Sequence, residues 1–247
     1  LGKYEIHETK APYGMVRDNS VLTAELVYAG QEISVTSTSV AVYNERQKVE
    51  VKLYKDLEKD ELFRIGSGDE ILHVYFALYA AEELTAADGS VIPADGLIEI
   101  AGVQADGTLV FASDLPIGSY YVKEYAVDAP YLISEETYPI TFTYEDDTTA
   151  VVRIEVNNGE AIGNRIIRGS ITGIKVDEQG EPLPGAVFGL FRADCTDFTM
   201  ENALLTAESA EDGSFSFEDI PYGVWLVREI AAPEGYVLSD EIFPVQI

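Results

Sequence analysis

The sequence predicts an all-β protein made of β-sandwich domains arranged in tandem. Short segments rich in β-branched and aromatic residues occur along the chain, for example at residues 140–144 and 151–156, and this composition favours strands. Turn signals separate such segments, at Asp88-Gly89, Asp106-Gly107, Asn158-Gly159 and Asp212-Gly213. In addition, residue patterns recur at intervals of about 105 to 120 positions, which is the usual size of one domain. Short strands set off by turns are typical of β-sandwiches.

The first recurring pattern runs from a glycine to a glutamate six positions later. It occurs at residues 2–8, 118–124 and 223–229. An Ala-Pro pair follows each copy, at Ala11-Pro12, Ala129-Pro130 and Ala232-Pro233. Self-similarity of this kind indicates repeated structural units, so we expect the glutamate to occupy the same strand position in each unit.

The second recurring pattern places a lysine eleven positions after an asparagine. Asn44 precedes Lys55 at this spacing, and Asn164 precedes Lys175. Strands are predicted between and after these residues, at residues 49–54, 76–79, 169–174 and 188–191. The only helical turns that the sequence predicts are at residues 80–84 and 201–205, and they are too short to form a helical layer.

Together the two patterns predict the domain organisation. We expect residues 1–44 to be the C-terminal part of a first domain, residues 45–168 a complete domain with insertions, and residues 169–247 a domain without its final strand. The third asparagine would lie beyond residue 247, so we expect the chain to be a window on a longer array.

The composition argues against several classes of function. Asp and Glu total 44 against 16 Lys and Arg, giving a formal net charge of −28, and such a surface repels phosphate backbones and anionic lipid headgroups. We therefore expect no nucleic-acid or membrane contact. A single cysteine, Cys195, excludes an internal disulfide, and we expect it to be buried or half-buried. His7 and His73 lie outside any HExxH frame, so we expect no metal, no cofactor and no enzyme acting on a diffusible substrate.

Three polar residues are predicted to meet inside the second unit. Lys55 lies two positions after Leu53, and Glu124 lies two positions after Val122. Because side chains alternate along a strand, both should point to the core. Asn164 should end the last strand of the same unit. A buried lysine beside a buried glutamate costs free energy unless the two are paired or neutralised.

These residue types can form a covalent bond. Burial lowers the pKa of an amine and raises that of a carboxylic acid, so a proton can pass between them and leave a neutral, nucleophilic amine. The protonated acid can polarise an asparagine carbonyl and pass protons to the leaving ammonia. We therefore predict a Lys–Asn isopeptide bond. Asn157 and Asn158 are alternatives to Asn164, which alone keeps the eleven-residue spacing; a buried polar network without a covalent bond is the other possibility.

The motifs of the third unit also resemble a known family. They are Lys175-Val176-Asp177, residues 184–190, residues 223–229, and Ala232-Pro233-Glu234-Gly235-Tyr236. They resemble the B-type repeat domains of collagen-binding adhesins, also called SpaA-type or prealbumin-like domains, of Gram-positive pilins and surface adhesins. The resemblance extends over nearly the whole chain and implies Ig-like or prealbumin-like sandwiches with intramolecular Lys–Asn bonds and a catalytic acid. By motif it implies the lysines Lys55 and Lys175, the catalytic glutamates Glu8, Glu124 and Glu229, and the asparagines Asn44 and Asn164.

The resemblance further implies a place on the bacterial cell surface, in or on the cell wall, with neighbouring domains of the same protein as partners. The second unit departs from the pattern, because Phe76 follows Lys55 by 21 positions whereas Phe188 follows Lys175 by 13. Two functions therefore stay open. One is a structural stalk or spacer stabilised by isopeptide bonds. The other is an adhesin module that recognises a host matrix protein or glycan through the insertions at residues 57–72 and 80–94.

Overall fold

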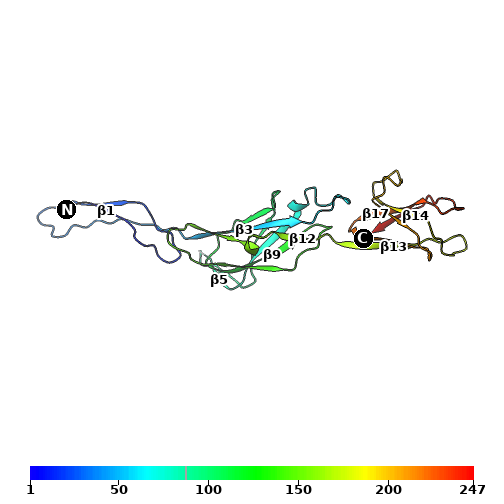
Figure 1. The fold of residues 1–247 in the computed structure, drawn as a ribbon. Helices are drawn as coiled ribbons and strands as arrows, with labels where there is room; N and C mark the ends of the chain where they lie inside the picture. The colour runs from blue at the N-terminus through cyan, green and yellow to red at the C-terminus, as the bar shows by residue number, and fades with distance from the viewer. Residues whose placement is uncertain (87) are drawn as a thin grey trace. The chain divides into compact units, whose positions relative to one another are not determined.

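The computed structural model describes residues 1–86 and 88–247 and is built almost entirely of short strands (Figure 1). The chain forms two compact units. The first contains Leu1–Lys55, Tyr75–Tyr125 and Glu135–Ile162, and the second contains Asp56–Val74, Ala126–Ser134 and Gly163–Ile247. The helical segments of the described residues are two 3-10 turns, η1 (Glu70–His73) and η2 (Val156–Gly159). The predicted all-β class is confirmed.

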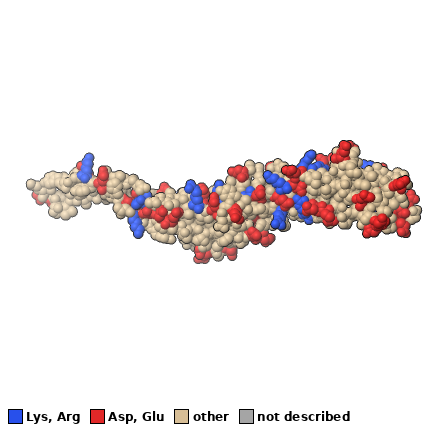
Figure 2. All heavy atoms as spheres, viewed as in Figure 1, with Lys and Arg blue, Asp and Glu red and all other residues tan. Residues whose placement is uncertain are grey.

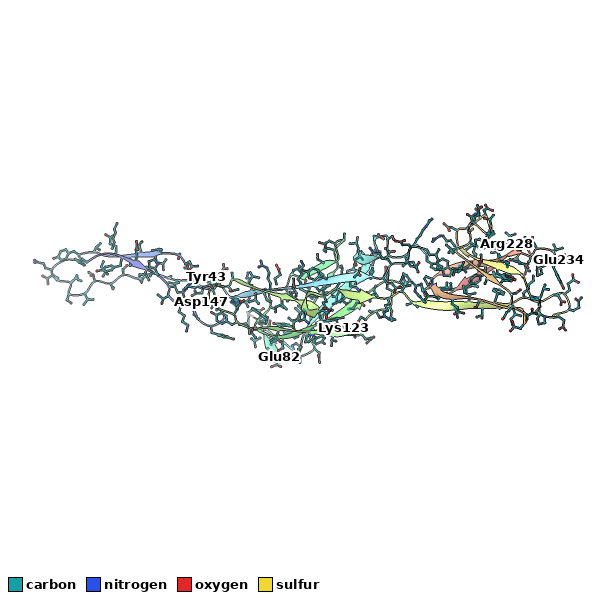
Figure 3. The ribbon with its side chains drawn as sticks, in the orientation of Figure 1. Tyr43, Glu82, Lys123, Asp147, Arg228 and Glu234 are labelled. Carbon is teal, nitrogen blue, oxygen red and sulfur yellow. The ribbon has the colours of Figure 1, made fainter. Side chains whose placement is uncertain are left out.

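The N-terminal segment carries an antiparallel hairpin of β1 (Gly2–Ile6) and β2 (Leu22–Leu26). The chain after β1 is bound by other parts of the first unit. The Ala11 N–H donates to the carboxylate of Asp147, labelled in Figure 3, over 3.1 Å. The buried Gln47 side chain donates to two carbonyls of the same loop. These bonds satisfy polar groups that strand pairing does not reach.

Two sheets form around the predicted crosslink residues. One has the strand order β11-β3-β12, with β8 also paired to β3, and the other has the order β10-β9-β4-β7. The strands of the first sheet are β3 (Lys48–Leu57), β8 (Thr108–Phe111), β11 (Val151–Glu155) and β12 (Ile162–Asn164). Those of the second are β4 (Tyr75–Ala80), β7 (Leu97–Gly102), β9 (Gly118–Ala126) and β10 (Thr137–Phe142). A small pair, β5 (Leu84–Thr85) and β6 (Val91–Ile92), forms a separate two-stranded sheet.

Alternate side chains of these strands are buried. Leu53 on β3, Leu78 on β4 and Val122 on β9 have no exposed surface. The neighbours of Leu53 and Val122 are more exposed, as the period-two pattern requires, whereas on β4 the small Ala77 beside Leu78 is buried as well. The apolar faces of both sheets thus supply a β-sandwich core.

The C-terminal residues form two more sheets, with the orders β13-β16 and β15-β14-β17-β18. Their strands are β13 (Arg168–Ile174), β14 (Val187–Arg192), β15 (Leu205–Glu208), β16 (Ser214–Pro221), β17 (Val224–Ala231) and β18 (Ile242–Gln246). The core between them is rich in aromatic residues and includes Phe188, Phe217 and Trp225. The rings of Phe188 and Phe215 stack with centroids 3.9 Å apart.

The predicted strands are confirmed, since each overlaps an observed strand. The predicted turns are confirmed as well, because Gly89, Gly107, Gly159 and Gly213 all have positive φ angles. Such angles carry little steric cost only at glycine.

The two predicted helical turns are wrong. Residues 80–84 form a bend that leads into β5, where the Ala81 N–H donates to the carbonyl of Ser119 on β9. Residues 201–205 form a turn that leads into β15, and the Leu204 N–H donates to the carbonyl of Leu190 on β14. At residues 80–84, the backbone pairs with a neighbouring strand. At the second place the Asn202 and Ala203 N–H groups donate to the Thr199 carbonyl, but this single turn does not continue through residues 204–205, where pairing with the neighbouring strand begins. Ala87, within the 80–94 insertion, lies outside the described residues.

Charged residues are scattered over the surface. Figure 2 shows acidic side chains spread over the visible face, with Lys and Arg among them. Within the described ranges, no helix is long and apolar enough to cross a membrane. No cluster of three or more His, Cys, Asp or Glu suited to a metal ion occurs in the same ranges.

Candidate functional site

Strand β3 and an Asp-Gly turn position Lys55. The side chain points inward with Val51 and Leu53, and none of it is exposed. The Lys55 N–H donates to the carbonyl of Gly107 over 2.7 Å. Gly107 has a φ of +79°, and a Cβ on it would lie only 2.6 Å from the Lys55 carbonyl oxygen. Only glycine therefore fits this turn against the backbone of the lysine.

Glu124 approaches the same amine from the other sheet. It lies on β9, in step with the buried Tyr120 and Val122. Its Oε1 is 3.9 Å from Nζ of Lys55, and neither side chain has any exposed surface. The Lys55 ammonium also donates to the Ile162 carbonyl at the start of β12, over 2.8 Å. The structure thus brings together an amine and an acid in a dry interior.

Asn164 is the last residue of β12 and is 3% exposed. Its Nδ2 donates to the Leu132 carbonyl over 2.7 Å, and its own backbone carbonyl accepts the N–H of Glu58 over 3.0 Å. Strand β12, which begins with the Ile162 acceptor, is the neighbour of β3 in the sheet. The side chain is therefore buried and oriented by hydrogen bonds on a strand adjacent to that of Lys55.

The two alternative asparagines have different surroundings. Asn157 and Asn158 lie in η2 with φ angles of 54° and 55°. Asn158 is exposed, and the Asn157 side chain donates to the carbonyl of Glu160 on the same turn. Asparagine tolerates the left-handed conformation that this turn needs, so the turn accounts for both residues.

A tyrosine supports the position of Asn164. The Tyr131 hydroxyl donates to the carbonyl of Glu58, whose N–H binds the Asn164 backbone. Burial, with smaller effects of nearby acids, raises the pKa of Tyr131 to about 12. Its hydroxyl therefore stays protonated and keeps donating over the physiological range. The recurring Ala-Pro pair at Ala129-Pro130 stands directly before this tyrosine, but the pattern does not predict its role.

A second acid–amide pair occurs in the N-terminal segment. The Asn44 Nδ2 donates to Glu8 over 2.6 Å and to the Val16 carbonyl over 2.9 Å. Glu8 also accepts the N–H of Asp18 over 2.6 Å. The structure therefore joins the glutamate and the asparagine that the repeat assigned to the first domain.

A second lysine–acid pair occurs in the C-terminal residues. Nζ of Lys175 is 3.2 Å from both carboxylate oxygens of Glu229, whose side chain is 1% exposed. Glu229 also accepts the N–H of Ser239. The Lys175 N–H donates to the carbonyl of Gly213, which repeats the arrangement at Lys55 and Gly107. This lysine is more accessible, with 21% of its side chain exposed.

The Lys175–Glu229 pair lines an open cleft of about 430 Å³. The cleft runs along β13 and β18, and most of its other lining residues are apolar: Ile171, Ile174, Val176, Phe188, Phe215, Val227, Phe243 and Val245. In chemical terms, each repeat contains part or all of one set: an amine, an acid and an amide.

The C-terminal residues match a known domain family. Residues 169–247 match the sequence model of the SpaA, prealbumin-like fold, domain. No curated protein sequence matches the chain.

Several solved structures are similar. The Bacillus anthracis TIE protein superposes with a TM-score of 0.65 and 22% identity, over 100% of this chain and 39% of that one. A streptococcal ancillary pilin has a TM-score of 0.33 and 18% identity, over 99% of this chain and 71% of that chain. A C-terminal fragment of the pilus adhesin SpaC from Lactobacillus rhamnosus GG has a TM-score of 0.49 and 14% identity, over 81% and 82%. The likeness to the B. anthracis protein establishes the fold alone.

Proposed function

Because residues 169–247 form a SpaA-type prealbumin-like domain, we propose that the chain is a structural spacer of a Gram-positive pilin or surface adhesin. It acts outside the cell, next to neighbouring domains of the same protein. Within it, residues 45–168 are closed by an isopeptide bond between Lys55 and Asn164. The observation that carries this proposal is the fully buried pair of Lys55 and Glu124.

A purely structural role explains this pair poorly. Taking an ammonium and a carboxylate out of water is expensive, and apolar residues of similar size usually stabilise an interior as well or better. The same lysine–acid pair recurs at Lys175 and Glu229. Recurrence at the same motif position favours a shared chemical role over a local packing solution.

The proposed reaction needs no cofactor. A proton passes from the Lys55 ammonium to Glu124, leaving a neutral amine beside a neutral acid. The amine attacks Cγ of Asn164 while the protonated Glu124 donates to the amide oxygen. This attack forms the Nζ–Cγ bond and gives a tetrahedral intermediate, which collapses by re-forming the carbonyl, returning the proton to Glu124 and breaking the Cγ–Nδ2 bond. The proton lost by the amine is passed to Nδ2, which leaves as ammonia.

The bond would constrain almost the entire domain. Lys55 and Asn164 are 109 positions apart, and closing a loop of that size stabilises a fold by roughly 4–5 kcal/mol in the chain-entropy model. A pulling force applied to β3 would be transmitted through the covalent bond to the end of β12. That property suits a spacer under shear.

Intact mass spectrometry of the folded chain tests the proposal. Only residues 45–168 contain all three matched residues, so we expect the loss of one ammonia from residues 1–247. Fragmentation should place the link between Lys55 and Asn164. Lys55→Ala and Glu124→Gln should each retain the ammonia, because one lacks the nucleophile and the other lacks the proton carrier.

Lys52→Ala is the matched control. Lys52 lies on the same strand, but its amine rests over the Tyr54 ring rather than in the core. This variant should lose ammonia like the unchanged protein. An unchanged protein that folds and keeps its full calculated mass would show that the bond does not form.

The alternative, recognition of a host matrix protein or glycan, receives less support at the 57–72 insertion. Leu57 and Phe63, two of its apolar side chains, are 5% and 6% exposed. Side chains already buried within the protein are not free to bind a ligand.

A further inference from the structure

The insertion of the middle repeat contributes an aromatic side chain to the C-terminal core. Residues Asp56–Val74, here called the docking loop, belong to the same compact unit as Gly163–Ile247. Phe63 of this loop is 6% exposed and is part of the core cluster that contains Trp225. The two rings meet edge to face, with centroids 4.9 Å apart and planes at 73°. This is a favoured geometry for aromatic pairs.

The docking loop is shaped by its own hydrogen bonds. Asp60 and Ile65 exchange both backbone bonds, at 3.0 and 2.9 Å. The Asp60 carboxylate also accepts the N–H of Phe63 over 3.0 Å. Gly66 has a φ of +77°, and a Cβ there would lie 2.8 Å from the Glu58 carbonyl oxygen. The loop therefore forms a closed turn that presents Phe63.

Arg192, the last residue of β14, holds the tip of the docking loop. Its guanidinium donates to the Leu62 carbonyl over 2.7 Å and to the Phe63 carbonyl over 3.0 Å. The planar fork of a guanidinium suits two adjacent acceptors. These bonds need only backbone carbonyls, so they fix the position of the loop whatever the side chain at position 62.

Arg168, the first residue of β13, holds the base of the docking loop. It pairs with Glu58 at 2.9 Å and with Asp60 at 2.8 Å. It also donates to the backbone carbonyl of Asp219 over 3.1 Å. In a chain with 44 acids and 16 basic residues, two arginines beside one acidic loop give it a matching charge.

We propose that the docking loop is a binding element whose partner is the following domain of the same chain. Phe63 fills an apolar socket at Trp225, and Arg168 and Arg192 recognise the acids and carbonyls of the loop. The C-terminal domain thus completes its core with a residue from the preceding repeat. The proposal rests on the fold and does not depend on isopeptide formation.

Trp225 provides a direct readout because it is the only tryptophan of the chain. In the full chain, Phe63→Ala should shift its emission to longer wavelength and raise the acrylamide quenching constant severalfold. Leu62→Ala is the matched control: Leu62 is 47% exposed and contributes its carbonyl to the docking. That variant should leave both quantities unchanged. Unchanged emission and quenching in Phe63→Ala would overturn the proposal.

A second variant tests the docking of the loop without removing a side chain from the core. Arg192→Gln removes the bonds to the loop and leaves Phe63 and Trp225 in place, so it should produce the same red shift, with far-UV circular dichroism preserved. Arg153→Gln, at an arginine 77% exposed on β11, is its control. A native spectrum in Arg192→Gln would count against the proposal even if Phe63→Ala unfolds the domain. Ammonia loss should be the same in all four variants, so failure here is distinct from failure of the crosslink.

Discussion

The backbone of Lys55 rests against a glycine whose replacement has a predictable effect. At Gly107, a Cβ would combine a positive φ with a 2.6 Å approach to the Lys55 carbonyl oxygen. We expect Gly107→Ala to lower the free energy of unfolding by about 1–3 kcal/mol and to slow crosslinking, because the lysine must shift. Thermal unfolding and a time course of intact mass measure the two effects.

Gly89→Ala is the control for backbone strain without the close approach. Gly89 has a φ of +84°, but a Cβ there would have no heavy atom of the described residues within 4 Å. Its replacement should cost about 1–2 kcal/mol and leave the crosslinking rate unchanged. Equal rates in both variants would mean that the Gly107 turn does not position Lys55.

At the residue scale, the sequence predicts which polar and charged side chains face the core but not their hydrogen-bond partners. Period two along β3 and β9 correctly predicts the burial of Lys55 and Glu124. The acceptors of the lysine and the asparagine, at Ile162 and Leu132, are backbone carbonyls. Any residue type supplies a carbonyl, so no sequence signal could identify these partners.

At the scale of elements, the docking loop shows what repeat analysis can miss. The spacing shows that the middle repeat has extra residues between Lys55 and Phe76. The spacing alone does not tell whether this insertion binds a ligand. The contacts that define the loop join Phe63 to Arg192 across 129 positions. Phe63 and Arg192 both lie outside the two recurring patterns, so neither pattern could predict this contact.

Two acids of the docking loop make its binding sensitive to pH. Hydrogen bonds from the Ile166 N–H and from Arg168 lower the pKa of Glu58 below its usual 4.5. Burial raises the pKa of Asp60, but hydrogen bonds from the Phe63 N–H and from Arg168 outweigh it, so the pKa of Asp60 falls below its usual 3.8. Groups with lowered folded pKa values stabilise the fold above their unfolded values and lose that contribution as pH falls through the folded ones.

We therefore expect the docking loop to release as the pH falls below about 4. Trp225 emission should shift red over this range in the unchanged protein. Asp60→Asn should show part of the shift already at neutral pH and a weaker change on acidification. Charged groups that also face the loop are Arg165, Arg168, Arg192 and Asp219, together with Glu70 within the loop itself. Arginine keeps its charge over this range. The same acid transition in Asp60→Asn and in the unchanged protein would contradict this assignment.

At the scale of the whole molecule, the compact units cut across the sequence repeats. Residues Asp56–Val74 and Ala126–Ser134 group with Gly163–Ile247, although the repeat pattern assigns them to the domain at 45–168. The period of the sequence repeat could be predicted because the same residue types recur at that spacing. The grouping of segments of one repeat with the next repeat could not be predicted, because it depends on contacts at one junction. The middle repeat therefore supplies segments to the compact unit that contains the C-terminal repeat.

Mechanical extension of the whole chain gives the most demanding test of the spacer function. If Lys55 and Asn164 are joined, the 109 positions between them cannot extend when the chain is pulled from its ends. Lys55→Ala should release this segment and add roughly 360–390 Å of contour length at 3.3–3.6 Å per residue. Single-molecule force spectroscopy measures that step, and Lys52→Ala should behave like the unchanged protein. If the unchanged protein releases the full length, load does not pass through a covalent bond, and the domain resists tension only by the strength of its sheets.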